Sequence, residues 1–144
     1  MAWYNQVHTS KKVRLGTRKK SITGKEYVYL TGVASTVAND WVAYDEVFIT
    51  TRTVANVKGG IAIAQAAVDS TSKYGWYGIW GSFTGNVATG ADNANVWVTS
   101  TAGRVDNTDV AVDILTNTLQ RSATASNLAT FELRYPYAHN AVLN

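Results

Sequence analysis

Apolar residues in this chain recur at a period near two, in short runs separated by Gly, Asn, Asp, Ser and Thr, and this pattern limits the fold more than any other feature. Such alternation is typical of extended strands, whose successive side chains point to opposite faces. Convincing helical periodicity is absent. We expect about eight strands, at residues 27–30, 41–50 (one bent strand or two pieces), 61–68, 74–81, 95–99, 104–105, 110–115 and 128–135. The sequence therefore predicts an all-β fold, a small antiparallel β-barrel or β-sandwich.

Two of these segments need comment. Residues 61–68 are rich in alanine, which favours helix, but the glycines before them and the alternation of Ile61 and Ile63 favour strand. Residues 74–81 would place Trp76 and Trp80 on one face and apolar residues on the other, as in a strand inside a barrel or sandwich. Core packing is accordingly the expected role of Trp76, Trp80 and Trp97.

Charge is distributed unevenly along the chain. Residues 1–25 carry seven cationic side chains and no acid, whereas residues 26–144 carry six bases against ten acids, a net charge of −4. Trp3 and Tyr4 stand at the head of this basic segment, where an isolated arm has no core to bury them. We predict an extended basic N-terminal arm that binds a partner. Its candidate binding residues are Trp3, Tyr4, Lys11, Lys12, Arg14, Arg18, Lys19, Lys20 and Lys25.

These observations divide the chain into an arm (residues 1–25), a β domain (residues 26–137) and a C-terminal tail (residues 138–144). Pro136, the only proline, is expected to help stop the last strand.

Residues suited to catalysis or metal binding are few. The chain has no cysteine, and His8 and His139 lie near the two ends without partners at metal-ligand spacing. Residues 92–95 and 106–109 contain oxygen ligands that calcium could use, but turn formation explains these Asp and Asn residues better. No apolar run approaches the roughly 18 residues of a membrane span. We therefore expect no enzymatic activity, cofactor, metal, small-molecule substrate or membrane partner.

Residues 59–137 resemble the small capsid decoration, or cement, proteins of tailed bacteriophages. The resemblance rests on the order of the segments, and its sharpest pieces are Tyr74-Gly75-Trp76 and Thr101-Ala102-Gly103-Arg104-Val105. It implies a β-rich body on the outside of the phage head that stabilises the shell without catalysis or a cofactor. The lysine-rich residues 1–25 match no motif of that family, so their role depends on charge alone.

The leading hypothesis is therefore a capsid decoration protein whose arm bridges neighbouring major capsid subunits. Its expected partners are the major capsid protein and possible further copies of this chain, and its expected location is the outer surface of the virion, after assembly in the host cytoplasm. Two alternatives remain: a small nucleic-acid-binding viral coat protein with a basic arm, and a carbohydrate-binding β module. The first requires a steep salt dependence, and the second requires exposed aromatic residues on the body.

Overall fold

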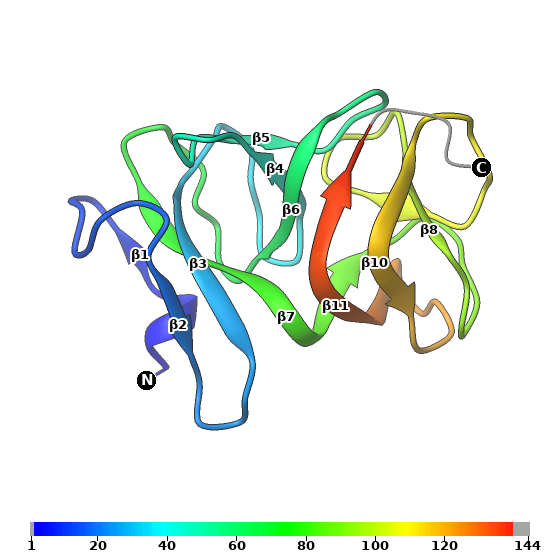
Figure 1. The fold of residues 1–144 in the computed structure, drawn as a ribbon, viewed down its shortest axis with the longest axis horizontal. Coiled ribbons are helices and arrows are strands. Elements are labelled where there is room, and N and C mark those ends of the chain that lie inside the picture. The colour runs from blue at the N-terminus through cyan, green and yellow to red at the C-terminus, as the bar shows by residue number, and fades with distance from the viewer. Residues whose placement is uncertain (1, 140–144) are drawn as a thin grey trace.

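The regular secondary structure of the described residues is almost entirely β-strand (Figure 1). The structure is a computed structural model that describes residues 2–139. It contains the 3-10 helix η1 (Trp3–Asn5) and the strands β1 (Val7–His8), β2 (Arg18–Lys20), β3 (Glu26–Thr31), β4 (Trp41–Tyr44), β5 (Thr50–Arg52), β6 (Gly59–Ala64), β7 (Tyr74–Asn86), β8 (Val96–Val98), β9 (Val105–Asp106), β10 (Ile114–Gln120) and β11 (Leu128–Ala138). The described residues form no α-helix. The predicted all-β class is confirmed.

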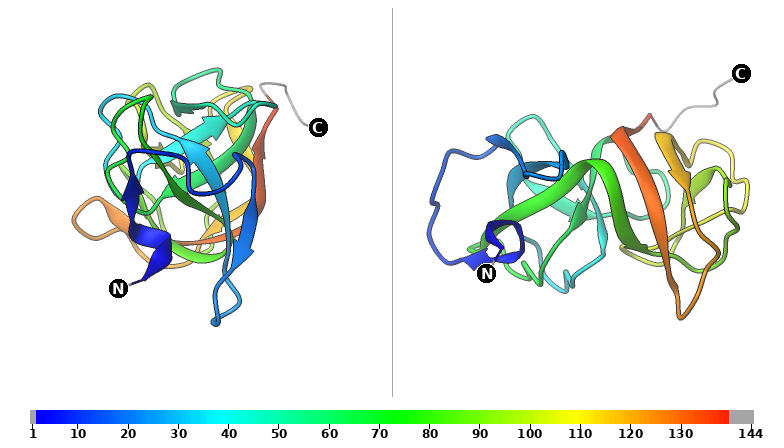
Figure 2. Two further views of the ribbon diagram at one scale, coloured as in Figure 1. Left: turned by 90° about the vertical axis from the view of Figure 1, so that its left-hand side faces the viewer. Right: turned by 90° about the horizontal axis from the view of Figure 1, so that it is seen from below.

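The eleven strands form one sheet that does not close on itself. Its main path runs β2-β3-β7-β6-β11-β10-β8-β9, with β1 on β7, and with β4 between β5 and β6. The named strands all pair antiparallel, as expected. The sheet is strongly coiled and the molecule is elongated, with β1, β2 and β3 at one end and β8, β9 and β10 at the other (Figures 1 and 2).

The long strand β7 connects the two ends. Its first half pairs with β3, and its second half pairs with β11 from Trp80 to Asn86. The two halves are joined at Gly81, whose φ of +115° is one that side-chain-bearing residues rarely adopt. The pairing with β3 also shifts register beside this point. The resulting bend lets one strand serve two sides of the coiled sheet.

This bend explains why one tryptophan lies where alternation did not predict it. Trp76 is buried in the main core, as expected, but Trp80 is 37% exposed and Trp97 is only partly buried. Phe83 then returns to the main core. The face that odd-numbered residues present changes between Ile79 and Phe83, on either side of Gly81, and Trp80 lies at this bend, where its side chain is exposed. The expected core role of Trp80 is wrong.

Both faces of the central strands are covered. Tyr27 and Tyr29 of β3 contribute to a large core, whereas Val28 and Leu30 contribute to a smaller cluster on the opposite face. The smaller cluster is covered by Val68 and the partly buried Phe48, which lie in connections outside the strands. Continuous apolar runs, rather than strict alternation, are the sequence signature of strands buried in this way.

The last strand continues through Pro136, which therefore does not stop it. Pro136 lies within β11 at an irregularity, where Thr116 pairs with Tyr137 but Thr118 pairs with Leu133. Proline is tolerated there because a bulge interrupts the backbone hydrogen bonds of the strand. Tyr135, just before it, has a φ of +56°. The β domain thus extends to Ala138, and residues 140–144 of the predicted tail lie outside the described residues.

Candidate interaction surfaces

The N-terminal segment, residues 2–25, belongs to the folded body. Tyr4 stacks on Tyr27 with ring centroids 5.1 Å apart, and Trp3 meets the rings of Tyr27 and Trp76 edge to face, each at 5.1 Å. Both residues are partly buried against the main core. Trp3 and Tyr4, predicted to bind a partner because an isolated arm has no core to bury them, therefore pack against the body of their own chain.

Backbone pairing holds the rest of this segment. Val7 and His8 pair with β7, and β2 pairs with β3 from Arg18 to Lys20. The prediction that residues 1–25 form a free extended arm is wrong for residues 2–25. The charge pattern did not predict this pairing. A lysine-rich strand can supply the backbone hydrogen bonds that β3 needs while its side chains stay in solvent.

Some of the predicted binding cations also contact the body. The Lys19 ammonium lies 4.3 Å from the centre of the Trp3 ring, and that of Lys25 lies 5.1 Å from the Phe83 ring. Arg18 lies 3.8 Å from the carboxylate of Glu26, and its guanidinium is 5.3 Å from the Tyr135 ring. Arg18 and Lys19 nevertheless remain exposed, so these contacts leave charge available to a partner.

The other cations flank the body from a loop and a hairpin. Lys11, Lys12 and Arg14 are exposed in the loop between β1 and β2, which extends from the same end of the molecule (Figure 2, right). The Lys12 amide donates to the hydroxyl of Tyr29 at 3.2 Å, which fixes the middle of this loop. Lys20 is exposed on β2. The nine predicted residues thus belong to η1, β2 and the segments between β1 and β3, with Trp3 and Tyr4 packed inward and with Arg18 and Lys25 reaching Tyr135 and Phe83.

The turn between β2 and β3 carries a residue that the sequence analysis missed. The Gly24 amide donates to the Ser21 carbonyl at 3.0 Å, and Gly24 has a φ of +87°, as in a three-residue hairpin loop. Ile22 stands in this turn fully exposed, and the hairpin projects beyond the body (Figure 2, left). The sequence signal for Ile22 was a β-branched residue at a turn position where Pro or polar residues are preferred. An apolar tip flanked by cations is thus presented to solvent.

The opposite end of the molecule differs in charge. Asp92 and Asp109 are exposed in the loops around β8 and β9, and Asp106, the last residue of β9, is partly exposed. Asp106 accepts a hydrogen bond from the Thr108 amide at 3.0 Å, which is the turn chemistry expected for residues 106–109. The molecule is therefore electrically polar along its length.

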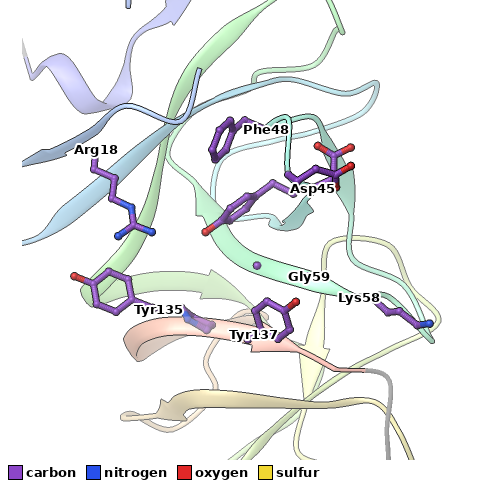
Figure 3. Close-up of a pocket in the computed structure, with 11 residues that line it drawn as sticks. Arg18, Asp45, Phe48, Lys58, Gly59, Tyr135 and Tyr137 are labelled. Atoms are coloured by element: carbon purple, nitrogen blue, oxygen red, sulfur yellow. The ribbon is translucent and has the colours of Figure 1, made fainter. Parts of the chain in front are cut away.

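A groove of about 580 Å³ crosses β4, β6 and β11 on the outer surface (Figure 3). Tyr44 lies on one side and Tyr135 and Tyr137 lie on the other, with Gly59 and Gly60 between them. Gly60 pairs with both Tyr44 and Tyr137, so the three residues form one cross-strand row. Arg18 and Lys58, together with Asp45 and Glu46, supply charges of both signs to the lining.

The tyrosines of the groove are held by specific contacts. Tyr135 donates a hydrogen bond from its hydroxyl to Glu26 Oε1 at 2.9 Å, and this bond to a carboxylate raises the pKa of Tyr135. Burial raises the pKa of Tyr44. Both phenols are therefore neutral near neutral pH and keep their hydroxyl protons for hydrogen bonding.

The two histidines lie in different environments. His8 is partly buried, and its Nδ1 lies 2.8 Å from the Tyr29 hydroxyl. Burial, together with the nearby Lys12, lowers the pKa of His8, so the neutral ring is favoured. His139 is exposed and lies against the Tyr137 ring. Of the two histidines, His139 is the more exposed to solvent.

Within residues 2–139, no three His, Asp, Glu or Cys side chains gather as a group that could hold a metal ion. No helix of this part of the chain is long and apolar enough to cross a membrane. Comparison with known proteins identifies no relative: no family model, no curated protein and no solved structure matches this chain.

Proposed function

We propose that this chain is a capsid decoration protein, which binds the outside of a tailed-phage head and bridges neighbouring major capsid subunits. The proposal rests on the resemblance of residues 59–137 to that family and on the character of the basic end. One observation carries most weight: Ile22 is fully exposed at the tip of a projecting hairpin between cationic residues. The proposal assigns the chain no reaction and no cofactor, and places it on the virion surface after assembly in the host cytoplasm.

The proposed contact with the capsid does not use a flexible N-terminal arm. Because residues 2–25 are already ordered on the body, docking does not require a long arm to lose its conformational freedom. Two cationic elements extend from the same end, the β1–β2 loop with Lys11, Lys12 and Arg14, and the β2–β3 hairpin. In the proposal, each contacts a different capsid subunit, which is what a bridging protein needs.

The expected energies show why an apolar tip matters. Exposed ion pairs contribute about 0–1 kcal/mol each and are screened by salt. Burial of one isoleucine side chain contributes about 1.5–3 kcal/mol. Repeated contacts on a lattice raise the effective concentration of each further contact, so modest single contacts suffice. The partner surface is therefore an apolar depression with an acidic rim.

Co-sedimentation with undecorated capsid shells of the phage that encodes this chain tests the proposal. Ile22→Asp should weaken shell binding about tenfold to hundredfold, from the loss of isoleucine burial. Val110→Asp is the matched control, because Val110 is also an exposed aliphatic residue but lies in a loop near the acidic end. Equal binding of both variants would contradict the proposed contact, and failure of the unsubstituted chain to bind shells would contradict the function.

Nucleic acid is the competing partner for a surface with seven cations. If the cations neutralise phosphates, the logarithm of affinity falls with the logarithm of salt concentration by about 0.7–0.9 for each phosphate contacted. Shell binding through Ile22 and a few ion pairs should have a shallower slope. Tight, steeply salt-dependent binding to duplex DNA or to RNA, without binding to shells, would favour the coat-protein alternative.

A further inference from the structure

The groove between Tyr44 and the pair Tyr135 and Tyr137 lies apart from the projecting hairpin and has no role in the proposed docking. We infer that it is a binding site for a neutral oligosaccharide. The inference is independent of capsid binding and depends on the shape of the groove, the exposure of its rings and the charges of its rim.

The floor of the groove is shaped by glycine. Tyr44, Gly60 and Tyr137 lie in register on neighbouring strands, so the two tyrosine backbones are separated by two strand spacings, about 10 Å. A Cβ atom on Gly60 would come within 2.5 Å of the Tyr44 ring, so this ring lies across the space that a side chain would occupy. Glycine at position 60 therefore lets the Tyr44 ring lie close over the strand, beside Tyr137 in the same row.

The rings on the far side are exposed and held in place. Tyr135 and Tyr137 are each 44% exposed, although aromatic rings of this size are usually covered. Tyr135 keeps a φ of +56°, unusual for a bulky residue, while its hydroxyl is bonded to the buried Glu26. Strained residues held by their surroundings are typical of ligand-binding sites. Rings that are fixed before binding lose little entropy when a ligand arrives.

The chemistry of the lining points to a sugar. A pyranose ring has faces of C–H groups that stack on aromatic rings, and a periphery of hydroxyls that donate and accept hydrogen bonds. The groove provides tyrosine rings for the faces, and its rim provides carboxylates of Asp45 and Glu46 as acceptors and the cations of Arg18 and Lys58 as donors. The lining carries two cationic and two anionic side chains, so their charges cancel, which suits an uncharged ligand. The volume of about 580 Å³ is in the usual range for ligand sites.

Other occupants fit this lining less well. The lining holds no Val, Leu, Ile or Met, and Pro136 is its one aliphatic side chain, so it offers little to an acyl chain or to an apolar helix. Aromatic grooves also bind proline-rich peptides, whose flanking basic residues usually need an acidic rim. Here Arg18 and Lys58 offset the attraction of Asp45 and Glu46 for such flanks. A proline-rich peptide is therefore the alternative that the experiment must separate.

Titration of the full, ¹⁵N-labelled chain, followed by nuclear magnetic resonance, tests the inference. The probes are chitotetraose, cellotetraose, maltotetraose and mannotetraose, with decaproline as the alternative ligand. At least one oligosaccharide should cause saturable shifts at the amides of Gly59, Gly60 and Tyr137 at millimolar concentrations or below. Tyr137→Ala should weaken that binding about tenfold, and Tyr137→Phe should weaken it less because the ring is kept.

Trp80→Ala is the matched control, because Trp80 is an exposed aromatic residue that does not line this groove. It should leave the affinity unchanged, and thermal unfolding of each variant should show that the fold is retained. The inference is overturned if none of the four oligosaccharides shifts the groove amides, if only decaproline does, or if Trp80→Ala weakens binding as much as Tyr137→Ala.

Discussion

Replacement of Trp3 by alanine tests whether the N-terminal segment is part of the folded body. Trp3 is partly buried, meets Tyr27 and Trp76 edge to face at 5.1 Å, and has the Lys19 ammonium 4.3 Å from its ring centre. Truncation of a fully buried tryptophan costs about 3–5 kcal/mol, and partial burial reduces this to about 2 kcal/mol. Loss of the cation–π contact adds about 0.5–1 kcal/mol.

Trp3→Ala should therefore lower the free energy of unfolding by about 2–3 kcal/mol. Urea unfolding followed by circular dichroism measures it, and the midpoint should fall with little change in the denaturant slope. Val13→Ala is the control, because Val13 is exposed in the loop that follows β1. If Trp3→Ala and Val13→Ala both stay within about 0.5 kcal/mol of the unsubstituted protein, the segment is a free arm and the packing described above is refuted.

Three further variants probe other parts of the fold. Arg52→Ala should destabilise the protein by about 2–3 kcal/mol in urea unfolding, because it leaves the buried Asp40 carboxylate without its cation 3.0 Å away; an unchanged midpoint would contradict this. Gly81→Ala should cost about 1–3 kcal/mol, since its φ of +115° strains an alanine; a gain in thermal stability would show that the bend is absent. Burial raises the pKa of Tyr27 from 10.0 to about 12, so the folded state favours the neutral phenol. That contribution to stability is complete below pH 10 and is lost as the pH rises to about 12; Tyr27→Phe should flatten the alkaline fall in stability, and an unaltered pH profile would refute the assignment.

Alternation predicted β11 well because burial of one face imposes a period of two on the side chains, whereas the central strands, buried on both faces, were predicted from short apolar runs. For residues 41–50 the pattern left one bent strand or two pieces open. The structure has β4 up to Tyr44, then a turn in which Asp45 Oδ1 accepts the amides of Val47 and Ile49, and β5 begins only at Thr50. Boundaries were less accurate: β10 begins at Ile114 rather than Val110. Residues 110–113 continue the strand-like pattern of side chains but are not part of the sheet, because a period of two does not show which segments pair with a neighbouring strand.

The N-terminal strands could not be predicted from pattern. Arg18, Lys19 and Lys20 are all exposed, so β2 has no buried face to mark it, and it forms because the edge of β3 needs backbone partners. Trp3 and Tyr4 were identified as anchor residues from their chemistry. That their partners are Tyr27 and Trp76 of the same chain depends on long-range contacts that local sequence does not encode.

The candidate sites were predicted unequally. The cationic end was identified residue by residue, because charge is visible in sequence. Ile22 was missed because single exposed aliphatic residues are common, so a β-branched residue in a turn is only a weak signal. The groove was missed because Tyr44, Gly60 and Tyr137 become neighbours only when β6 pairs with both β4 and β11.

A reconstruction of decorated shells by electron cryomicroscopy tests the central claim most directly, because it locates the chain and shows which of its surfaces touches the capsid. The account predicts density for the chain on the exterior, with the Ser21–Lys25 turn seated in an acidic-rimmed depression and the Lys11–Arg14 loop on an adjacent subunit. Density inside the shell, or a bound chain whose hairpin points into solvent, would contradict it.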